Sequence, residues 1–219
     1  AAPLADPERQ AAIARRCPEV YRERYNWERE SEKLVALFRS VLPATPPIAP
    51  AVANALPRVY VPNRQGNDVT VIDPATMKVV DRFDVGIHPQ HVVPSWDLKT
   101  LWVTNNAEGR PDGSLTPIDP ATGKPGKTIA IEDPYNMYFS PDGKSAIVVA
   151  EALKRLDFRD PQTMALQSSI AVPQCKGINH ADFSIDGRVA IFTCEFQGGL
   201  ARIDLVDRKV TGYLKLSKG

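Results

Sequence analysis

The polar residues best suited to chemistry in this 219-residue sequence recur at a nearly constant spacing. They form two sets, and the members of each set lie 45 and 44 residues apart. The first set is His91, Asn136 and His180, and the second set is Asn106, Glu151 and Glu195. Imidazole and carboxylate groups that converge on one point can bind a divalent metal or act as acid and base. Whether they converge depends on the elements that position them.

Two short motifs predict those elements, because they recur at about the same interval as the candidate residues. The first motif occupies residues 95–99, 140–144 and 184–188, where the sequence reads Ser-Trp-Asp-Leu-Lys, Ser-Pro-Asp-Gly-Lys and Ser-Ile-Asp-Gly-Arg. The second motif starts at Asp73, Asp119, Asp160 and Asp204, at intervals of 46, 41 and 44 residues. Short apolar runs between such turn signals are typical of antiparallel strands. A repeat of about 40 to 50 residues that holds four strands is typical of a β-propeller blade.

The repeat therefore predicts a mainly β protein, a partial β-propeller of about four blades over residues 58–219. We expect three strands in the first blade and four in each of the next three. The reason is that no Ser-x-Asp turn precedes the strand at residues 59–61, so the innermost strand of the first blade is missing. The strand at 59–61 should then be an exposed edge, and exposed blade edges favour self-association.

The sequence also resembles a known repeat family. Residues 101–105, Leu-Trp-Val-Thr-Asn, stand where the YVTN-type β-propeller family has its Tyr-Val-Thr-Asn motif, and residues 71–76 match its outer turn. The resemblance covers about residues 58–216. Because this family is typically seven-bladed, it implies that four blades form an open arc and that the chain is a fragment of a larger protein. It also implies a periplasmic or extracellular setting.

Alignment of the blades places both candidate sets at one face, near the mouth of the central channel. The first set opens the innermost strand of each blade, and the second set closes the neighbouring strand. We expect a ligand-binding site there; alternatively, these residues hydrogen-bond the loops between blades. Cys175 and Cys194 fall near the same face. They can form a disulfide if their Cα atoms lie within about 7 Å, or they can be two buried thiols.

The first 57 residues have a different composition. Residues 1–42 predict an amphipathic α-helical segment, with an apolar stripe formed by Trp27, Leu34, Phe38 and Val41. Residues 43–57 hold five prolines and five alanines and predict an extended linker. The helical segment resembles the C-terminal tail of group-1 glycosyltransferases, which implies a cytoplasmic setting. The glutamate pair and glycine loop of that family are absent from this sequence, so no transferase activity is carried over.

Composition excludes several partners and leaves the ligand open. A net charge of +1 argues against nucleic acid as a partner, and no apolar run is long enough to span a bilayer. The first residues lack the features of a signal peptide. No cofactor is required by the sequence. We therefore expect a binding or scaffold module for a protein or small-molecule ligand, and not an enzyme.

Two other functions remain open from the sequence. Propellers of similar repeat include lactonases and haem d1 domains, so the resemblance allows a lactonase-like enzyme or a metal- or haem-dependent redox protein at the channel mouth. The N-terminal segment allows a glycosyltransferase remnant fused to a propeller.

Overall fold

The computed structural model describes Lys33 and residues 49–110 and 112–216. The helical segment expected over residues 1–42 lies outside the described residues, except for Lys33, which is helical. Residues 49–219 form a unit of their own. This unit holds every repeat, and the description below concerns its described residues.

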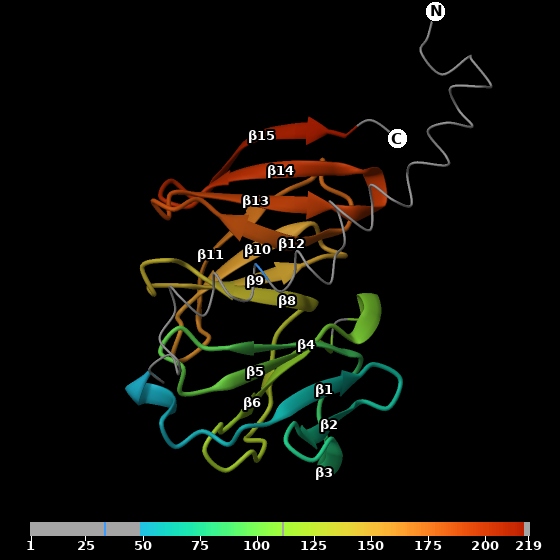
Figure 1. Ribbon diagram of the computed structural model, residues 1–219. Coiled ribbons are helices and arrows are strands. Elements are labelled where there is room, and N and C mark those ends of the chain that lie inside the picture. Colours follow the sequence, from blue (N-terminus) through green and yellow to red (C-terminus); the bar gives the residue numbers. More distant parts are fainter. Residues whose placement is uncertain (1–32, 34–48, 111, 217–219) are drawn as a thin grey trace, which may run out of the picture. The chain divides into compact units, whose positions relative to one another are not determined.

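Four antiparallel sheets follow one another along this unit (Figure 1). The first sheet has three strands and each later sheet has four, which confirms the expected strand count. The strands are β1 (Val59–Asn63), β2 (Asp68–Asp73), β3 (Lys78–Asp84), β4 (Pro89–Pro94), β5 (Leu101–Asn105), β6 (Ser114–Ile118), β7 (Ile129–Ala130), β8 (Pro134–Phe139), β9 (Ala146–Ala150), β10 (Arg155–Arg159), β11 (Leu166–Ala171), β12 (Ile178–Phe183), β13 (Val189–Cys194), β14 (Gly199–Asp204) and β15 (Lys209–Lys215). Strands pair in chain order within each sheet. The first strands β1, β4, β8 and β12 contact one another in that order, as in consecutive propeller blades.

The repeated Ser-x-Asp motif closes the turn between the first two strands of the second, third and fourth sheets. In the third sheet, Ser140 Oγ donates to Asp142 Oδ1 (2.7 Å), which also accepts from Lys144 N (3.1 Å). Ser140 Oγ in turn accepts from Ser145 N (3.0 Å). The other two turns make the same three bonds at 2.6 to 3.2 Å. The motif recurs because its side chains replace the main-chain partners that a tight turn lacks.

The hydrophobic core consists of three clusters, each between two consecutive sheets. Strand β9 contributes to two of them. Its Ala146 and Val148 belong to the cluster shared with the second sheet, whereas Ile147 and Val149 belong to the cluster shared with the fourth sheet. All five residues of β9 are buried. This explains why its sequence is an unbroken apolar run instead of an alternating one.

The segment before β1 corrects one expectation, because it is not extended throughout. Pro50–Val52 form a short 3-10 helix, η1, with proline at its start, where the missing N–H costs no helical hydrogen bond. Leu56 N then donates to Pro120 O (2.8 Å) in the turn between β6 and β7. The end of the expected linker at residues 43–57 is thus attached to the second sheet.

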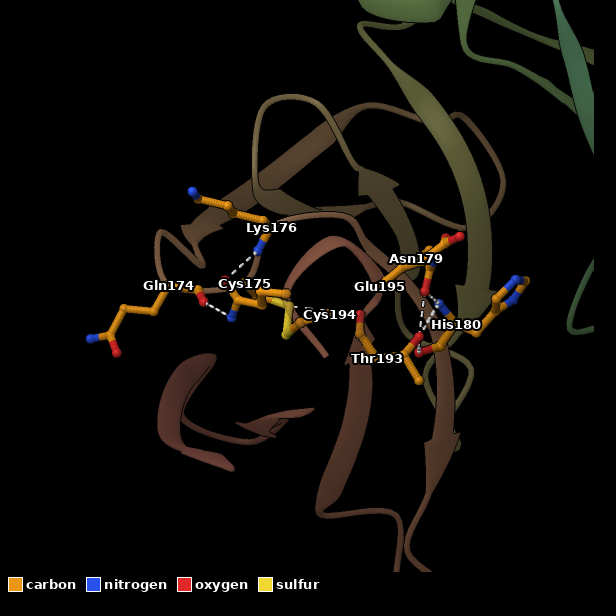
Figure 2. The surroundings of a disulfide bond; sticks show 9 residues. Gln174, Cys175, Lys176, Asn179, His180, Thr193, Cys194 and Glu195 are labelled. Atoms are coloured by element: carbon orange, nitrogen blue, oxygen red, sulfur yellow. Dashed lines mark hydrogen bonds between the residues drawn. A yellow bond between two sulfur atoms is a disulfide. The ribbon is translucent and has the colours of Figure 1, made fainter. Parts of the chain in front are cut away.

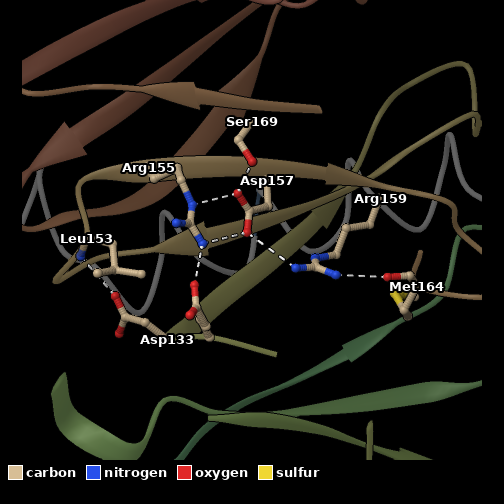
Figure 3. Close-up of polar contacts among 8 residues, drawn as sticks. Asp133, Leu153, Arg155, Asp157, Arg159, Met164 and Ser169 are labelled. Atoms are coloured by element: carbon tan, nitrogen blue, oxygen red, sulfur yellow. Dashed lines mark hydrogen bonds and ion pairs between the residues drawn. The ribbon is translucent and has the colours of Figure 1, made fainter. Parts of the chain in front are cut away.

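A buried carboxylate occupies the middle of the third sheet (Figure 3). Asp157 of β10 is fully buried and accepts hydrogen bonds from Arg155 Nε (2.7 Å) and Ser169 Oγ (2.6 Å). Arg159 Nη2 lies 3.4 Å from its second oxygen. A buried charge is tolerated where opposite charges and donors surround it. Asp157 therefore links β10 to β11 and to two arginines on its own strand.

Candidate functional site

The inner strands β4, β8 and β12 each begin with a β-bulge. In β4 and β8 the pairing skips one residue, Gln90 and Tyr135 respectively, and in β12 it shifts after Ile178. The extra residue of a bulge lies outside the hydrogen-bond ladder, and its side chain is re-aimed. The bulges therefore let the side chains of Gln90 and Tyr135, which lie between two paired positions near the end of the sheet, depart from the regular alternation of the strand.

A left-handed residue precedes each bulge by two positions. His88, Asp133 and Gly177 hold equivalent positions in the three repeats and have φ values of 51°, 46° and 68°. This conformation is unfavourable for residues with a Cβ atom, and Asp is among those that tolerate it best. The turn is therefore a regular part of the repeat, and in the third sheet it carries a carboxylate.

A pocket of about 450 Å³ opens at this end of the sheets and is named the mouth pocket here. Four of its lining residues are the first residues after β1, β5, β9 and β13, so each sheet contributes one: Arg64, Asn106, Glu151 and Glu195. The others are Gln90, Glu108, Asp133, Tyr135, Ala152 and Phe196. The structure thus brings the second sequence-predicted set into one pocket and adds Arg64 from the first sheet.

The first sequence-predicted set, His91, Asn136 and His180, does not line the mouth pocket. His91 Nδ1 lies 2.9 Å from Tyr135 O in the next sheet, and its ring centroid is 5.4 Å from that of His180. Asn136 Nδ2 donates to Tyr138 Oη (3.0 Å) and lies 3.4 Å from His180 Nδ1. Burial lowers the pKa of His91, although the Tyr135 carbonyl opposes this effect. These side chains join neighbouring inner strands, which is the inter-blade role that the sequence left as the alternative.

In the second and fourth sheets a side chain at the bulge donates a hydrogen bond to the pocket residue, Asn106 or Glu195, of the same sheet. Gln90 Nε2 donates to Asn106 Oδ1 (3.3 Å), and Asn179 Nδ2 donates to Glu195 Oε2 (2.5 Å). The two residues of each pair are 16 positions apart in the sequence. The repeat therefore positions a bulge side chain and a mouth side chain as a unit.

The third sheet supplies one buried carboxylate, Asp133, and one half-buried carboxylate, Glu151, that lack such a bulge partner. Asp133 is 3% exposed; its Oδ2 accepts from Leu153 N (3.1 Å), but its Oδ1 has no hydrogen-bond partner among the described residues (Figure 3). Burial raises the pKa of Asp133. Burial, followed by the negative charges of Asp133 and Glu195, raises the pKa of Glu151 to about 7. Burial and the charges of Glu151 and Glu195 also raise the pKa of Tyr135. Glu151 is therefore about half protonated at neutral pH.

The first and second sheets contribute a paired charge to the mouth pocket. Arg64 forms an ion pair with Glu108, and His88 Nδ1 lies 2.9 Å from the other oxygen of Glu108. Glu108 has a left-handed φ of 49°, and its N–H donates to Asn106 Oδ1 (3.2 Å). The positive charge of Arg64 is therefore compensated locally, and the carboxylates of the third sheet are not.

Cys175 and Cys194 form a disulfide bond, and their Cα atoms are 4.9 Å apart (Figure 2). It joins the loop before β12 to the last residue of β13, directly before Glu195. Thr193 Oγ1 and Asn179 Oδ1 form a short hydrogen bond, and Asn179 also holds Glu195. Of the two states that the sequence left open for these cysteines, the structure contains the disulfide.

Within the described part of the chain, no group of three His, Cys, Asp or Glu side chains is arranged to hold a metal ion. Metal ligands must lie about 2.0 to 2.6 Å from one point. The carboxylates of the mouth pocket therefore surround a space and not a single ion position.

Sequence reasoning missed several of these residues. Gln90 and Tyr135 lie one position before the first set, on the opposite face of a regular strand, and only the bulge brings them to the pocket. No residue type in the sequence marks that bulge. Arg64 was missed because the first sheet lacks the Ser-x-Asp motif from which positions were counted. The available signal was the alignment of residues 63–64, Asn-Arg, with residues 105–106, Asn-Asn.

Comparison with known families decides the relationship. The sequence model of the YNCE-like β-propeller family matches residues 27–166, which is more than half of the chain. The chain belongs to the YNCE-like β-propeller family. Membership agrees with the four consecutive sheets and with the YVTN-type repeat. No curated protein sequence matches this member of the family. No helix among the described residues is both long and apolar enough to cross a membrane.

Solved structures show the same fold in larger proteins. Hydrazine synthase of Kuenenia stuttgartiensis matches with a TM-score of 0.61 and 24% identity, over 74% of this chain and 47% of that chain. The periplasmic gluconolactonase of Pseudomonas aeruginosa matches with a TM-score of 0.56 and 20% identity, over 69% and 50%. A functionally unknown protein from Desulfotomaculum acetoxidans gives 0.57 and 12%, over 74% and 53%. This YNCE-like chain therefore spans about half the length of these structures, and the likeness concerns the fold.

Proposed function

We propose that this protein is a ligand-binding β-propeller whose mouth pocket takes up a small polar molecule. One observation carries the proposal: four consecutive sheets place the residue at one repeat position, Arg64, Asn106, Glu151 and Glu195, along a single pocket. Within the described residues, the Glu151 carboxylate has neither a hydrogen bond nor an ion pair. Half-buried charges with shifted pKa values and no partner in their own chain are typical of functional sites.

Binding is favoured over catalysis because no imidazole is among the described residues that line the pocket beside its carboxylates. Glu151 could transfer a proton near neutral pH, but His91 is engaged by the Tyr135 carbonyl and His88 lies 2.9 Å from Glu108. The described residues provide no set of metal ligands, so no metal-dependent step is proposed.

A screen of small polar molecules tests the proposal. We expect some of them to raise the melting temperature of the protein and to shift the NMR signals of the mouth pocket. Asn106→Ala should weaken this binding at least tenfold, because it removes one lining side chain and releases Gln90. The control is Lys144→Ala, which changes an exposed residue of the Ser140 turn and should bind as the wild type does. Equal binding by wild type and Asn106→Ala, or no perturbation of the mouth pocket by any molecule, would contradict the proposal.

We also propose that the four sheets are an arc of a seven-bladed ring and that a further blade packs on the fourth sheet. The inner turns support this. A Cβ atom on Gly143 would lie 2.6 Å from Trp96, and one on Gly187 would lie 2.9 Å from Pro141, so each turn tip packs on the glycine of the next sheet. The equivalent tip in the fourth sheet, Ile185, is fully exposed.

The strands of the fourth sheet lead to the same conclusion. Ile147 of β9 is fully buried against the fourth sheet, whereas Ile191, its equivalent in β13, is 36% exposed. Ile185 and Ile191 thus fit a blade that brings its own inner strand and glycine turn. In its absence, a second copy of the chain can cover them.

Sedimentation over a range of concentrations tests this part. We expect the protein to self-associate and Ile191→Lys to shift the equilibrium toward monomer without lowering the melting temperature. The matched control is Leu166→Lys, an exposed residue of the outer strand β11 in the third sheet, which should leave the equilibrium unchanged. If the wild-type protein stays monomeric at every concentration, the proposal that the fourth sheet presents an exposed docking face is wrong.

We further propose an oxidising compartment, the periplasm or the exterior. The Cys175–Cys194 disulfide supports it, because such bonds persist mainly in oxidising compartments. The chain has three cysteines, so protein isolated from its source without reductant should show one reactive thiol after denaturation. Three reactive thiols would place it in a reducing compartment.

A further inference from the structure

We propose that the mouth pocket takes a small organic cation with N–H groups, held by the carboxylates of Asp133, Glu151 and Glu195 beside the ring of Tyr135. The inference rests on the proposed function, since it names the class of ligand for the same pocket. It follows from the charges that line the pocket, from one unpartnered oxygen and from the absence of a metal geometry.

Negative charge exceeds positive charge in the mouth pocket. Four carboxylates line it, and Arg64 is its one cationic lining residue. Arg64 is already paired with Glu108. Among the residues that the structure describes, none forms an ion pair with Asp133, Glu151 or Glu195. The pocket therefore retains up to three uncompensated carboxylates, and a cation from solution would compensate them.

The Oδ1 atom of Asp133 points to a ligand independently of the charge count. Asp133 is 97% buried and lines the pocket, yet no described donor reaches this atom. The nearby cation, Arg155, donates to Asp157 and to Glu132 instead (Figure 3). Buried acceptors in folded proteins are nearly always satisfied. A donor supplied by the ligand would satisfy this one after a rotation of the Asp133 side chain opens the atom, which has almost no accessible surface, to the pocket.

The shape of the site favours an organic cation over a metal ion. No three potential ligands of the described chain are arranged around one metal position, and the pocket measures about 450 Å³. Ammonium and guanidinium groups bind carboxylates through charge-assisted hydrogen bonds of about 2.7 to 2.9 Å. The face of an aromatic ring such as Tyr135 also attracts cations. An amine or guanidine of a few carbon atoms fits all three features.

Binding should be linked to the protonation of Glu151. The charged or titratable groups that line the pocket with it are Arg64, Glu108, Asp133, Tyr135 and Glu195. A cation binds the ionised carboxylate, and Glu151 has a pKa of about 7. The ionised fraction rises from about one tenth at pH 6 to about nine tenths at pH 8, so the affinity should rise up to about tenfold over this interval. Burial also raises the pKa of Asp133, which adds to the same trend.

Isothermal titration calorimetry with putrescine and agmatine on the full chain tests the proposal. We expect both to bind, the uncharged diol of the same length as putrescine not to bind, and the affinity to rise from pH 6 to pH 8. Glu151→Gln and Asp133→Asn should each weaken binding at least tenfold, and Glu151→Gln should flatten the pH dependence. Asn tolerates the φ of 46° at position 133, so Asp133→Asn keeps the turn. The control is Glu132→Gln, an exposed carboxylate outside the pocket, which should bind normally.

Three results would overturn the inference. If neutral polar molecules shift the mouth signals and the diamines do not, the ligand class is wrong and the proposed function stands. If calcium binds more tightly than putrescine and Glu151→Gln abolishes this binding, the pocket is a metal site. If neither charged nor neutral molecules perturb the mouth pocket, the proposed function fails as well.

Discussion

Two buried carboxylates of the third repeat, Asp157 and Asp133, differ in how the chain satisfies them. Asp157 lies inside the sheet and accepts hydrogen bonds from Arg155, Arg159 and Ser169. Asp133 lies at the mouth, where the main-chain N–H groups of Leu153 and Ala152 and the charge of Arg155 favour its ionised form, but burial outweighs them and its Oδ1 has no well-aligned donor among the described residues. Inside the sheet the fold neutralises its own charge. At the mouth it leaves a charge uncompensated, at a cost in stability that a bound partner would offset.

The largest effect should come from removal of the compensated carboxylate. Asp157→Ala would leave Arg159 without its counter-charge and Arg155 with only the exposed Glu132, and we expect a loss of about 3 to 4 kcal/mol in the free energy of unfolding. Urea denaturation measures it. Glu132→Ala removes the exposed partner of Arg155 and should change stability by less than about 0.5 kcal/mol. Similar losses for both variants would show that burial does not distinguish the two carboxylates.

The disulfide should come next, because it holds the mouth of the fourth sheet by a covalent bond and not by ion pairs. Cys175→Ala together with Cys194→Ala opens a loop with a sequence separation of 19 residues. Loop entropy predicts a loss of about 3 kcal/mol. Denaturation of the wild-type protein with and without reductant also measures the difference in stability between the reduced and the disulfide-bonded forms. A loss below about 1 kcal/mol would mean that the hydrogen bonds of Asn179 and Thr193 suffice.

Glu151 should have a smaller effect, which makes the free energy of unfolding fall as the pH rises. Its pKa rises from an ordinary value of 4.5 to about 7 in the folded protein, so the folded state binds this proton more tightly than the unfolded state. The stabilisation that protonated Glu151 contributes below pH 4.5 is therefore lost as the pH rises toward 7. Because Glu151 is half exposed, we expect a loss of about 1 to 2 kcal/mol relative to Glu151→Gln. The difference between the two pH–stability curves measures it, and a difference that grows in the opposite direction would refute the assigned pKa.

The smallest effect should come from the polar residue at the same repeat position in the second sheet. Asn106→Ala loses the bonds from Gln90 and from the Glu108 N–H. Loss of such a capping side chain costs about 0.5 to 1 kcal/mol. Thermal unfolding measures it. A loss as large as that of Asp157→Ala would mean that the mouth residues serve mainly to hold the fold.

The fold was largely predictable from the sequence, because its signals are local and repeated. The Ser-x-Asp turns each make the same three hydrogen bonds, so their spacing fixes the strand count. The site was predictable only in part. Positions counted from Ser140 and its equivalents found Glu151 and Glu195, since these follow regular strands. They missed Tyr135, because a bulge changes the register without leaving a mark in the sequence.

The charges of the pocket show a second limit of sequence reasoning. Asp157 and Asp133 are the same residue type in the same repeat, and only their surroundings distinguish a structural group from a candidate site. Arg155 could have paired with either carboxylate. The structure shows that it donates to Asp157 and Glu132, while it acts on Asp133 through its charge alone.

The bulge at the start of each inner strand also affects which residues of the mouth pocket can be substituted. A residue in a regular strand is constrained on both faces, because its neighbours pack against the next sheet. The bulge residues Gln90 and Tyr135 stand outside that constraint, as do the residues that follow β1, β5, β9 and β13. Arg, Asn and two Glu occupy that last position in four otherwise similar blades. In the second and fourth blades this residue is hydrogen-bonded to Gln90 or Asn179, so a substitution there also removes the partner of the bulge residue. In the third blade the Glu151 side chain has no such bond among the described residues, so this position can change alone without disturbing the core.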